Sequence, residues 1–133
     1  MIQRTPVGQK LYEALQEHAL WRVVARKAVQ DGRCNETAKA LASDNECPLG
    51  KWLHYEIDHT HRSEAEYEIL KEAHRRFHLA LAGVVAAIER GDLGAAAERV
   101  EPRSEFADLC SVMNRELLHW LAKTEAAHHR AAA

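Results

Sequence analysis

Hydrophobic residues recur every three or four positions along most of the chain, which is the spacing of amphipathic α-helices. In the first long segment, roughly residues 7–30, one side carries Leu11, Leu15, His18 and Ala25. Asp31-Gly32 follows, and a glycine just past a helix C-terminus readily takes the left-handed conformation that ends a helix. The pattern therefore predicts a long first helix that ends before Gly32.

The clearest helical pattern covers about residues 64–90. Its apolar face consists of Leu70, Phe77, Leu81, Val84, Val85 and Ile88. His74 and His78 lie on or beside the same face, so we expect both imidazoles to point inward. The preceding run His59–Glu64 indicates a break, with Ser63 as the N-cap of this helix, and Gly91-Asp92 ends it.

A final helix is predicted over about residues 104–126. Its apolar positions alternate steps of four and three: Phe106, Cys110, Met113, Leu117 and Trp120. This short heptad-like seam fits either packing inside the chain or a dimer contact, and we favour the first.

Shorter helical segments are predicted over residues 36–42, from Cys47-Pro48 onward, and over residues 93–100. Proline suits the first turn of the segment after Cys47, because its missing N–H has no partner there in any helix. No strand pattern is evident. The sequence thus predicts an all-α protein, an up-and-down four-helix bundle with short extra helices, in one domain over residues 1–133.

Composition narrows the class of protein. The chain has 133 residues and a formal charge of -2, with acidic and basic residues interspersed. No basic stripe suggests nucleic acid, and no apolar run approaches the ~20 residues that span a bilayer. The N-terminus lacks the apolar core of a secretion signal, and three irregularly spaced cysteines suit reduced thiols. We expect a cytoplasmic protein without nucleic-acid or membrane partners.

Candidate chemistry begins with His74 and His78. Four positions apart on a helix, their rings project from one face, one turn apart. Burying two imidazoles is costly unless their ring nitrogens find partners. Hydrogen bonds to carboxylates would supply such partners, and so would a metal ion.

Cys47 opens the run CPLGKW, where a loop passes into a helix. Free N–H groups at a helix start favour a thiolate, the form that binds metal. We expect Gly50 to permit close approach of another helix and Trp52 to shield the site from water. Cys34 and Cys110 are expected to be ordinary buried cysteines.

His18, inside the first helix, completes a set of three imidazoles and one thiolate. Such a set is typical of tetrahedral zinc sites and leaves no coordination position for a substrate. We therefore predict one Zn²⁺ per chain, bound by His18, Cys47, His74 and His78, in a protein that is not an enzyme.

A competing reading uses two Glu-x-x-His motifs, Glu56 with His59 and Glu116 with His119. Di-iron carboxylate bundles carry two such motifs plus a glutamate from each of two other helices. Glu17 and Glu72 are the nominal candidates for those positions. His59 falls at an expected helix end, which weighs against this reading.

The chain resembles the chemoreceptor zinc-binding (CZB) domain family. The resemblance rests on HALW from His18, CPLGKW from Cys47 and HRRFH from His74, in that order and at similar separations. It is strongest over residues 11–88. A Cys-x-Leu-Gly-x-Trp run with spaced histidines on both sides is specific, whereas each piece alone is common.

The resemblance implies a bacterial cytoplasmic sensory module, a helical bundle that forms homodimers and binds zinc through three histidines and a cysteine. Such modules are attached to chemoreceptor signalling domains or to diguanylate cyclases, and some respond to oxidants through the zinc-bound cysteine. No such output domain is recognisable here, which suggests a free-standing member or an excised domain. Two other classes remain as alternatives: a metalloenzyme and a metal-independent helical dimerisation adaptor.

Overall fold

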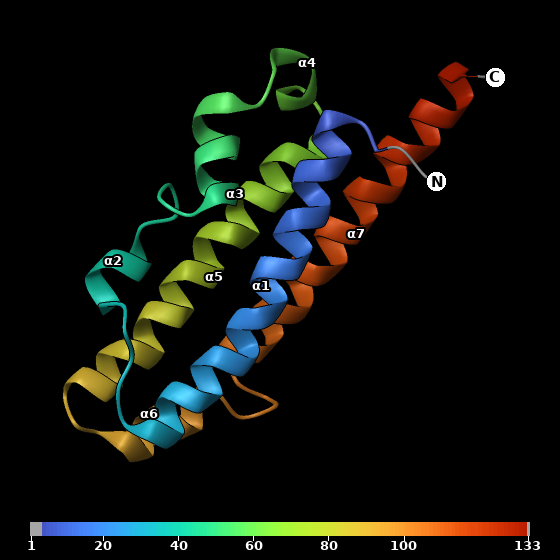
Figure 1. Cartoon of the computed structure of the whole chain (residues 1–133). Helices are drawn as coiled ribbons and strands as arrows, with labels where there is room; N and C mark the ends of the chain where they lie inside the picture. The colour runs from blue at the N-terminus through green and yellow to red at the C-terminus, as the bar shows by residue number, and fades with distance from the viewer. Residues whose placement is uncertain (1–3, 133) are drawn as a thin grey trace.

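The computed structural model describes residues 4–132, and every regular element in that range is helical (Figure 1). Three long helices run alongside one another: α1 (Pro6–Asp31), α5 (Ala65–Glu89) and α7 (Glu105–Ala132). Helix α7 packs against both α1 and α5. The all-α prediction is confirmed for the described residues.

Between α1 and α5 the chain returns along the side of α5 through short elements (Figure 1). These are α2 (Ala38–Ala42), α3 (Pro48–Lys51), the π-helix η1 (Trp52–Glu56) and α4 (His59–Arg62). A short α6 (Leu93–Arg99) joins α5 to α7. The helical segment predicted from Cys47-Pro48 onward is broken into pieces, so it does not form a fourth long helix. Helix α2 packs on α5, and α3 contacts α1.

The ends of α1 follow local sequence rules. The Thr5 hydroxyl accepts a hydrogen bond of 2.9 Å from the Gly8 N–H, and Pro6 occupies the first turn. Gly32 closes the helix with φ 72°, a left-handed conformation that is unstrained for glycine. The predicted end of the first helix is confirmed.

The region before α5 differs from its prediction. Residues 59–62 form the single turn α4, and Ser63 ends that turn by donating a hydrogen bond of 2.7 Å to the Thr60 carbonyl. Glu64, without a side-chain capping bond, is the N-cap of α5. The assignment of Ser63 as the N-cap was wrong because its hydroxyl serves the preceding turn.

Helix α7 continues beyond the predicted end near Ala126, through a run rich in alanine, the strongest helix former. The core of the described chain contains four of the five seam residues: Phe106, Met113, Leu117 and Trp120. Packing inside the chain, the favoured reading of that seam, is confirmed. No helix among residues 4–132 is both long and apolar enough to span a bilayer.

Candidate metal centre

The middle of α5 carries two histidines on its buried face. His74 is 0% exposed and His78 is 4% exposed, and both lie among apolar residues such as Leu70, Phe77 and Leu81. His18 reaches the same region from α1 and is 5% exposed. These are the buried polar side chains of the described core. The ring centroids lie 4.5 Å apart for His74 and His78 and 5.2 Å apart for His18 and His74.

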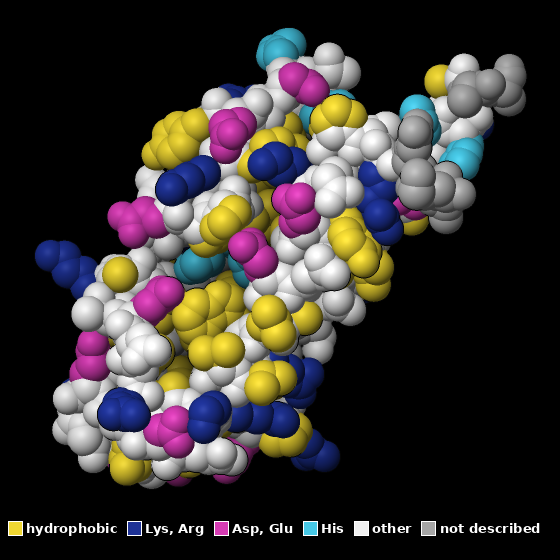
Figure 2. Space-filling view, in the orientation of Figure 1, with side chains coloured by type: hydrophobic (Ala, Val, Ile, Leu, Met, Phe, Trp, Pro, Cys, Tyr) yellow, Lys and Arg dark blue, Asp and Glu magenta, His cyan; other side chains and the backbone are white. Residues whose placement is uncertain are grey.

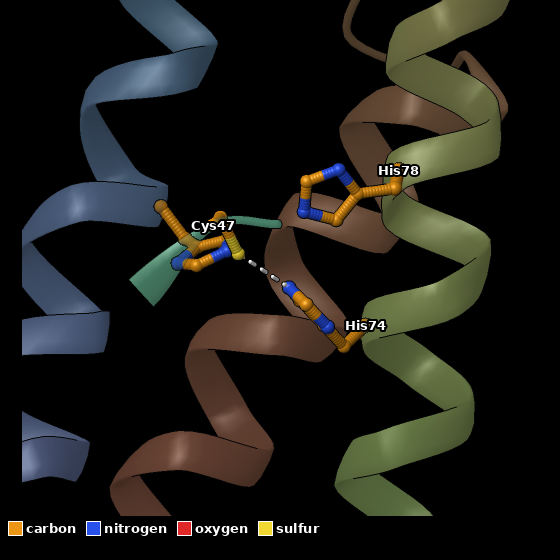
Figure 3. A group of neighbouring side chains, drawn as sticks. Cys47, His74 and His78 are labelled. Carbon is orange, nitrogen blue, oxygen red and sulfur yellow. Dashed lines mark hydrogen bonds between the residues drawn. The ribbon is translucent and has the colours of Figure 1, made fainter. Parts of the chain in front are cut away.

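Cys47 completes the group. In Figure 3 the rings of His74 and His78 project from α5 toward the Cys47 sulfur. The distance from Cys47 Sγ to His74 Nε2 is 3.3 Å. One ligand atom from each of His18, Cys47, His74 and His78 lies within 4.8 Å of the others. The structure therefore brings together the four residues predicted from the sequence.

Two of the imidazoles are held in a defined tautomer. His18 Nδ1 lies 2.9 Å from the Ala14 carbonyl, and His78 Nδ1 lies 2.9 Å from the Leu41 carbonyl. A carbonyl only accepts, so each Nδ1 carries the proton and each Nε2 presents a lone pair. Both Nε2 atoms are buried and have no hydrogen-bond partner among the described residues. Metal-binding histidines are typically held in this way.

His74 is held differently. Its Nε2 faces the Cys47 sulfur, while its Nδ1 is buried without a partner among the described residues. The ring is positioned by α5 and by packing against its neighbours rather than by a carbonyl.

Electrostatics favour neutral imidazoles at this site. Burial lowers the pKa of His18 to about 4, with the Ala14 carbonyl acting in the opposite direction. Burial, followed by the neighbouring His78 and His18, lowers the pKa of His74 to about 2. Burial also lowers the pKa of His78. All three rings are thus neutral at neutral pH, with one nitrogen free of a proton, and this is the form that can bind a metal ion.

The Cys47 thiol behaves differently from the expectation. Cys47 is the N-cap of α3, and its sulfur accepts a hydrogen bond of 3.3 Å from the Gly50 N–H. Burial nevertheless raises its pKa and outweighs this bond, with Glu17 and Asp44 adding to the increase. The helix start alone does not produce a thiolate, so the negative charge on sulfur requires a cation.

Gly50 has a role other than the predicted one, whereas shielding of the site by Trp52 stays a prediction. A Cβ at Gly50 would collide with the Asp44 carbonyl and lie 3.0 Å from Asn45 Cα, so the close neighbour is the preceding loop and not another helix. Trp52 is buried and packs against Trp120, with ring centroids 6.1 Å apart. Gly50 keeps the loop before Cys47 close to the start of α3.

The residues of the di-iron reading do not converge. Glu56, His59 and His119 are exposed, and Glu72 forms ion pairs with Arg75 and Arg76. Within residues 4–132, the four residues described above form the one cluster whose geometry suits a metal ion. Cys34 and Cys110 are half-buried and lie outside it.

The donor set fits zinc. Bond lengths of about 2.0–2.3 Å to nitrogen and sulfur place tetrahedral ligand atoms about 3.3–3.8 Å apart. Closing this cluster around one ion therefore requires its widest pairs, up to 4.8 Å, to approach by about 1 Å. Three imidazole nitrogens and one sulfur favour zinc over harder ions such as Mg²⁺ or Ca²⁺.

Comparison with known proteins agrees with this chemistry. The comparisons with curated proteins and with solved structures gave no match. The sequence model of the chemoreceptor zinc-binding domain matches residues 18–85, half of the chain, and this range includes all four candidate ligands. The chain therefore belongs to the chemoreceptor zinc-binding domain family.

Proposed function

We propose that this chain is a zinc-dependent regulatory domain, and not an enzyme, that holds one Zn²⁺ through His18, Cys47, His74 and His78. One observation carries the proposal: the buried Nε2 atoms of His18 and His78, which have no hydrogen-bond partner among residues 4–132, face the same small space as a cysteine sulfur. An unpaired buried nitrogen costs free energy, and a bound cation would remove that cost at each of them.

Four protein ligands around one zinc ion support a regulatory role and not a catalytic one. Catalytic zinc sites keep one position for water or substrate, and four protein ligands leave none. The ligands come from α1, α5 and the start of α3, so the free energy of zinc binding stabilises the packing of these elements. Zinc loss, or oxidation of the Cys47 thiolate to a poorer sulfenic acid ligand, would release α3 from α1 and α5.

Membership of the family suggests which proteins respond to this change in the packing of α3. We infer a cytoplasmic protein whose state is read by a bacterial signalling protein of the chemoreceptor or diguanylate cyclase type. We also infer that zinc draws α3 and η1 into the position of a fourth bundle helix.

A homodimer through α1 is part of the proposal. Leu20 (63% exposed), Val23 (66%) and Val24 (44%) follow the i, i+3, i+4 spacing of a helix-packing stripe. A stripe of this kind on one helix can pair with its own copy across a twofold axis. The molecular mass in solution, compared with that of Val23→Glu, tests this contact.

The deciding experiment is metal analysis of the untagged chain. We expect about one zinc per chain, and a lower or readily lost content in Cys47→Ala. Zinc near zero in the native chain would favour the adaptor alternative, and an unchanged content in Cys47→Ala would remove Cys47 from the site.

His18→Ala separates the regulatory domain from an enzyme. If His18 is a ligand of a closed site, this substitution weakens zinc binding. In a hydrolase that uses only Cys47, His74 and His78 as ligands, the zinc content of His18→Ala would remain that of the native chain.

A further inference from the structure

A cavity of about 480 Å³ opens between α1 and the segment containing α2 and the start of α3. Its lining includes three of the four candidate ligands: His18, Cys47 and His78. Figure 2 shows a hollow near the middle of the molecule, with histidine side chains inside it and acidic side chains around it. The cavity therefore connects solvent to the candidate metal site.

The lining of this cavity is negatively charged. Exposed carboxylates of Glu17, Glu36 and Glu46 line it, and its described lining contains no lysine or arginine. A cation that enters is attracted along the whole passage, whereas an anion is repelled.

The inner end of the cavity also points to a cation. His18 and His78 both line it, both are more than nine-tenths buried, and both present an Nε2 without a hydrogen-bond partner among residues 4–132. The carboxylates at the mouth and the nitrogens inside therefore offer successive donors to one ion.

A second cavity touches His18 but has the opposite character. Its volume is about 170 Å³, and its lining among the described residues includes Arg22, Cys110 and Asn114 but no carboxylate. The guanidinium of Arg22 disfavours a cation at this side. The acidic cavity therefore suits the passage of a metal ion better than this second cavity does.

We propose that Glu17, Glu36 and Glu46 form an acidic mouth that captures Zn²⁺ and passes it to His18, Cys47 and His78. The acidic mouth is a transient binding site on the path of the ion from solvent to its ligands. This inference rests on the proposed zinc function. The carboxylates are not final ligands. They raise the local concentration of the cation and thus the rate of association.

The test compares association rates of the full chain with and without these charges. Zinc-free protein is mixed rapidly with Co²⁺, whose visible absorption bands report tetrahedral coordination, and Zn²⁺ is then measured by competition. We expect E17Q/E36Q/E46Q to slow association on the order of tenfold at low salt and to lose most of the salt dependence. The final Co²⁺ spectrum should stay unchanged, and the dissociation constant should change much less than the rate.

A matched control removes three carboxylates elsewhere. Glu68, Glu98 and Glu101 are exposed and lie outside the lining of this cavity, so E68Q/E98Q/E101Q changes the net charge equally. An unaltered rate in E17Q/E36Q/E46Q, or equal slowing in the control, would overturn the acidic mouth. Failure of the native chain to bind Co²⁺ or Zn²⁺ would instead overturn the proposed function, so the two failures are distinguishable.

Discussion

Cys47 and Cys110 each share a cavity with His18, yet only Cys47 belongs to the candidate metal centre. Burial raises the pKa of both thiols, that of Cys110 to about 11. The difference lies in their neighbours: Cys47 has the His74 imidazole at 3.3 Å, whereas Cys110 has the guanidinium charges of Arg22 and Arg26 nearby. Cys110 shares a cavity with one histidine and lies outside the cluster, whereas Cys47 lies where three neutral imidazoles converge.

The backbone also differs between the two cysteines. Cys110 lies inside α7, a helix of 28 residues, whereas Cys47 lies at the junction of a loop with a helix of four residues. Few local hydrogen bonds fix the second position. We therefore expect Cys47 to move when its ligand partners are lost and Cys110 to stay in place.

The largest expected effect is on zinc affinity, and it differs between substitutions of the two cysteines. Structural zinc sites contribute about 10–16 kcal/mol from four ligands, so loss of one ligand should weaken binding by about 10²-fold or more. We expect this loss for Cys47→Ala and unchanged affinity for Cys110→Ala, measured by competition with a chromophoric chelator. Equal losses in both variants would remove the distinction.

A smaller effect concerns the loop that positions Cys47. Gly50→Ala places a methyl group against the Asp44 carbonyl, which must move. Overpacking of this kind costs about 1–3 kcal/mol, and we expect a lower denaturation midpoint together with weaker zinc binding. The matched control is Gly94→Ala in α6, where the nearest atom to the new Cβ is Asp92 Oδ1 at 3.8 Å. A stability equal to that of Gly94→Ala would show that the loop adapts freely.

The pH dependence of zinc affinity also distinguishes Cys47 from Cys110. The lowered pKa values of His18, His74 and His78 leave no proton on their ligand nitrogens at neutral pH, whereas the raised pKa of Cys47 leaves its thiol protonated. Binding should release about one proton, so affinity rises about tenfold per pH unit from near 7 up to the Cys47 pKa.

Calorimetry in buffers of different ionisation enthalpy measures this proton release. Cys110→Ala should behave as the native chain does, and Cys47→Ala should release no proton. Release of two or more protons by the native chain at pH 7 would contradict the neutral state of the imidazoles.

Much of this structure was predictable from the sequence because helical periodicity is a local property. The spacing of His74 and His78, the glycine that ends α1 and the inward face of α5 all follow from residues within a few turns of one another. The positions of His18 and Cys47 were found because their residue types complete a zinc donor set.

Features that depend on distant contacts were not predictable in this way. The π-helix η1 ends with a hydrogen bond from the Ile57 N–H to the Trp52 carbonyl, and no periodic pattern in the sequence predicts it. The role of Gly50 depends on where the Asp44 loop lies, and the raised pKa of Cys47 depends on burial by other segments. The acidic mouth combines residues from α1 and from two loops, so no single stretch of sequence displays it.

Helix α2 contributes no ligand, yet the Leu41 carbonyl near its C-terminus accepts the Nδ1 proton of His78. The negative end of a helix dipole at this carbonyl makes the opposite nitrogen of the ring a stronger donor. Displacement of α2 would weaken that donor, and by thermodynamic reciprocity the loaded site must hold α2 in place with the same free energy. A partner that binds α2 would thereby change the affinity of the site for the metal ion.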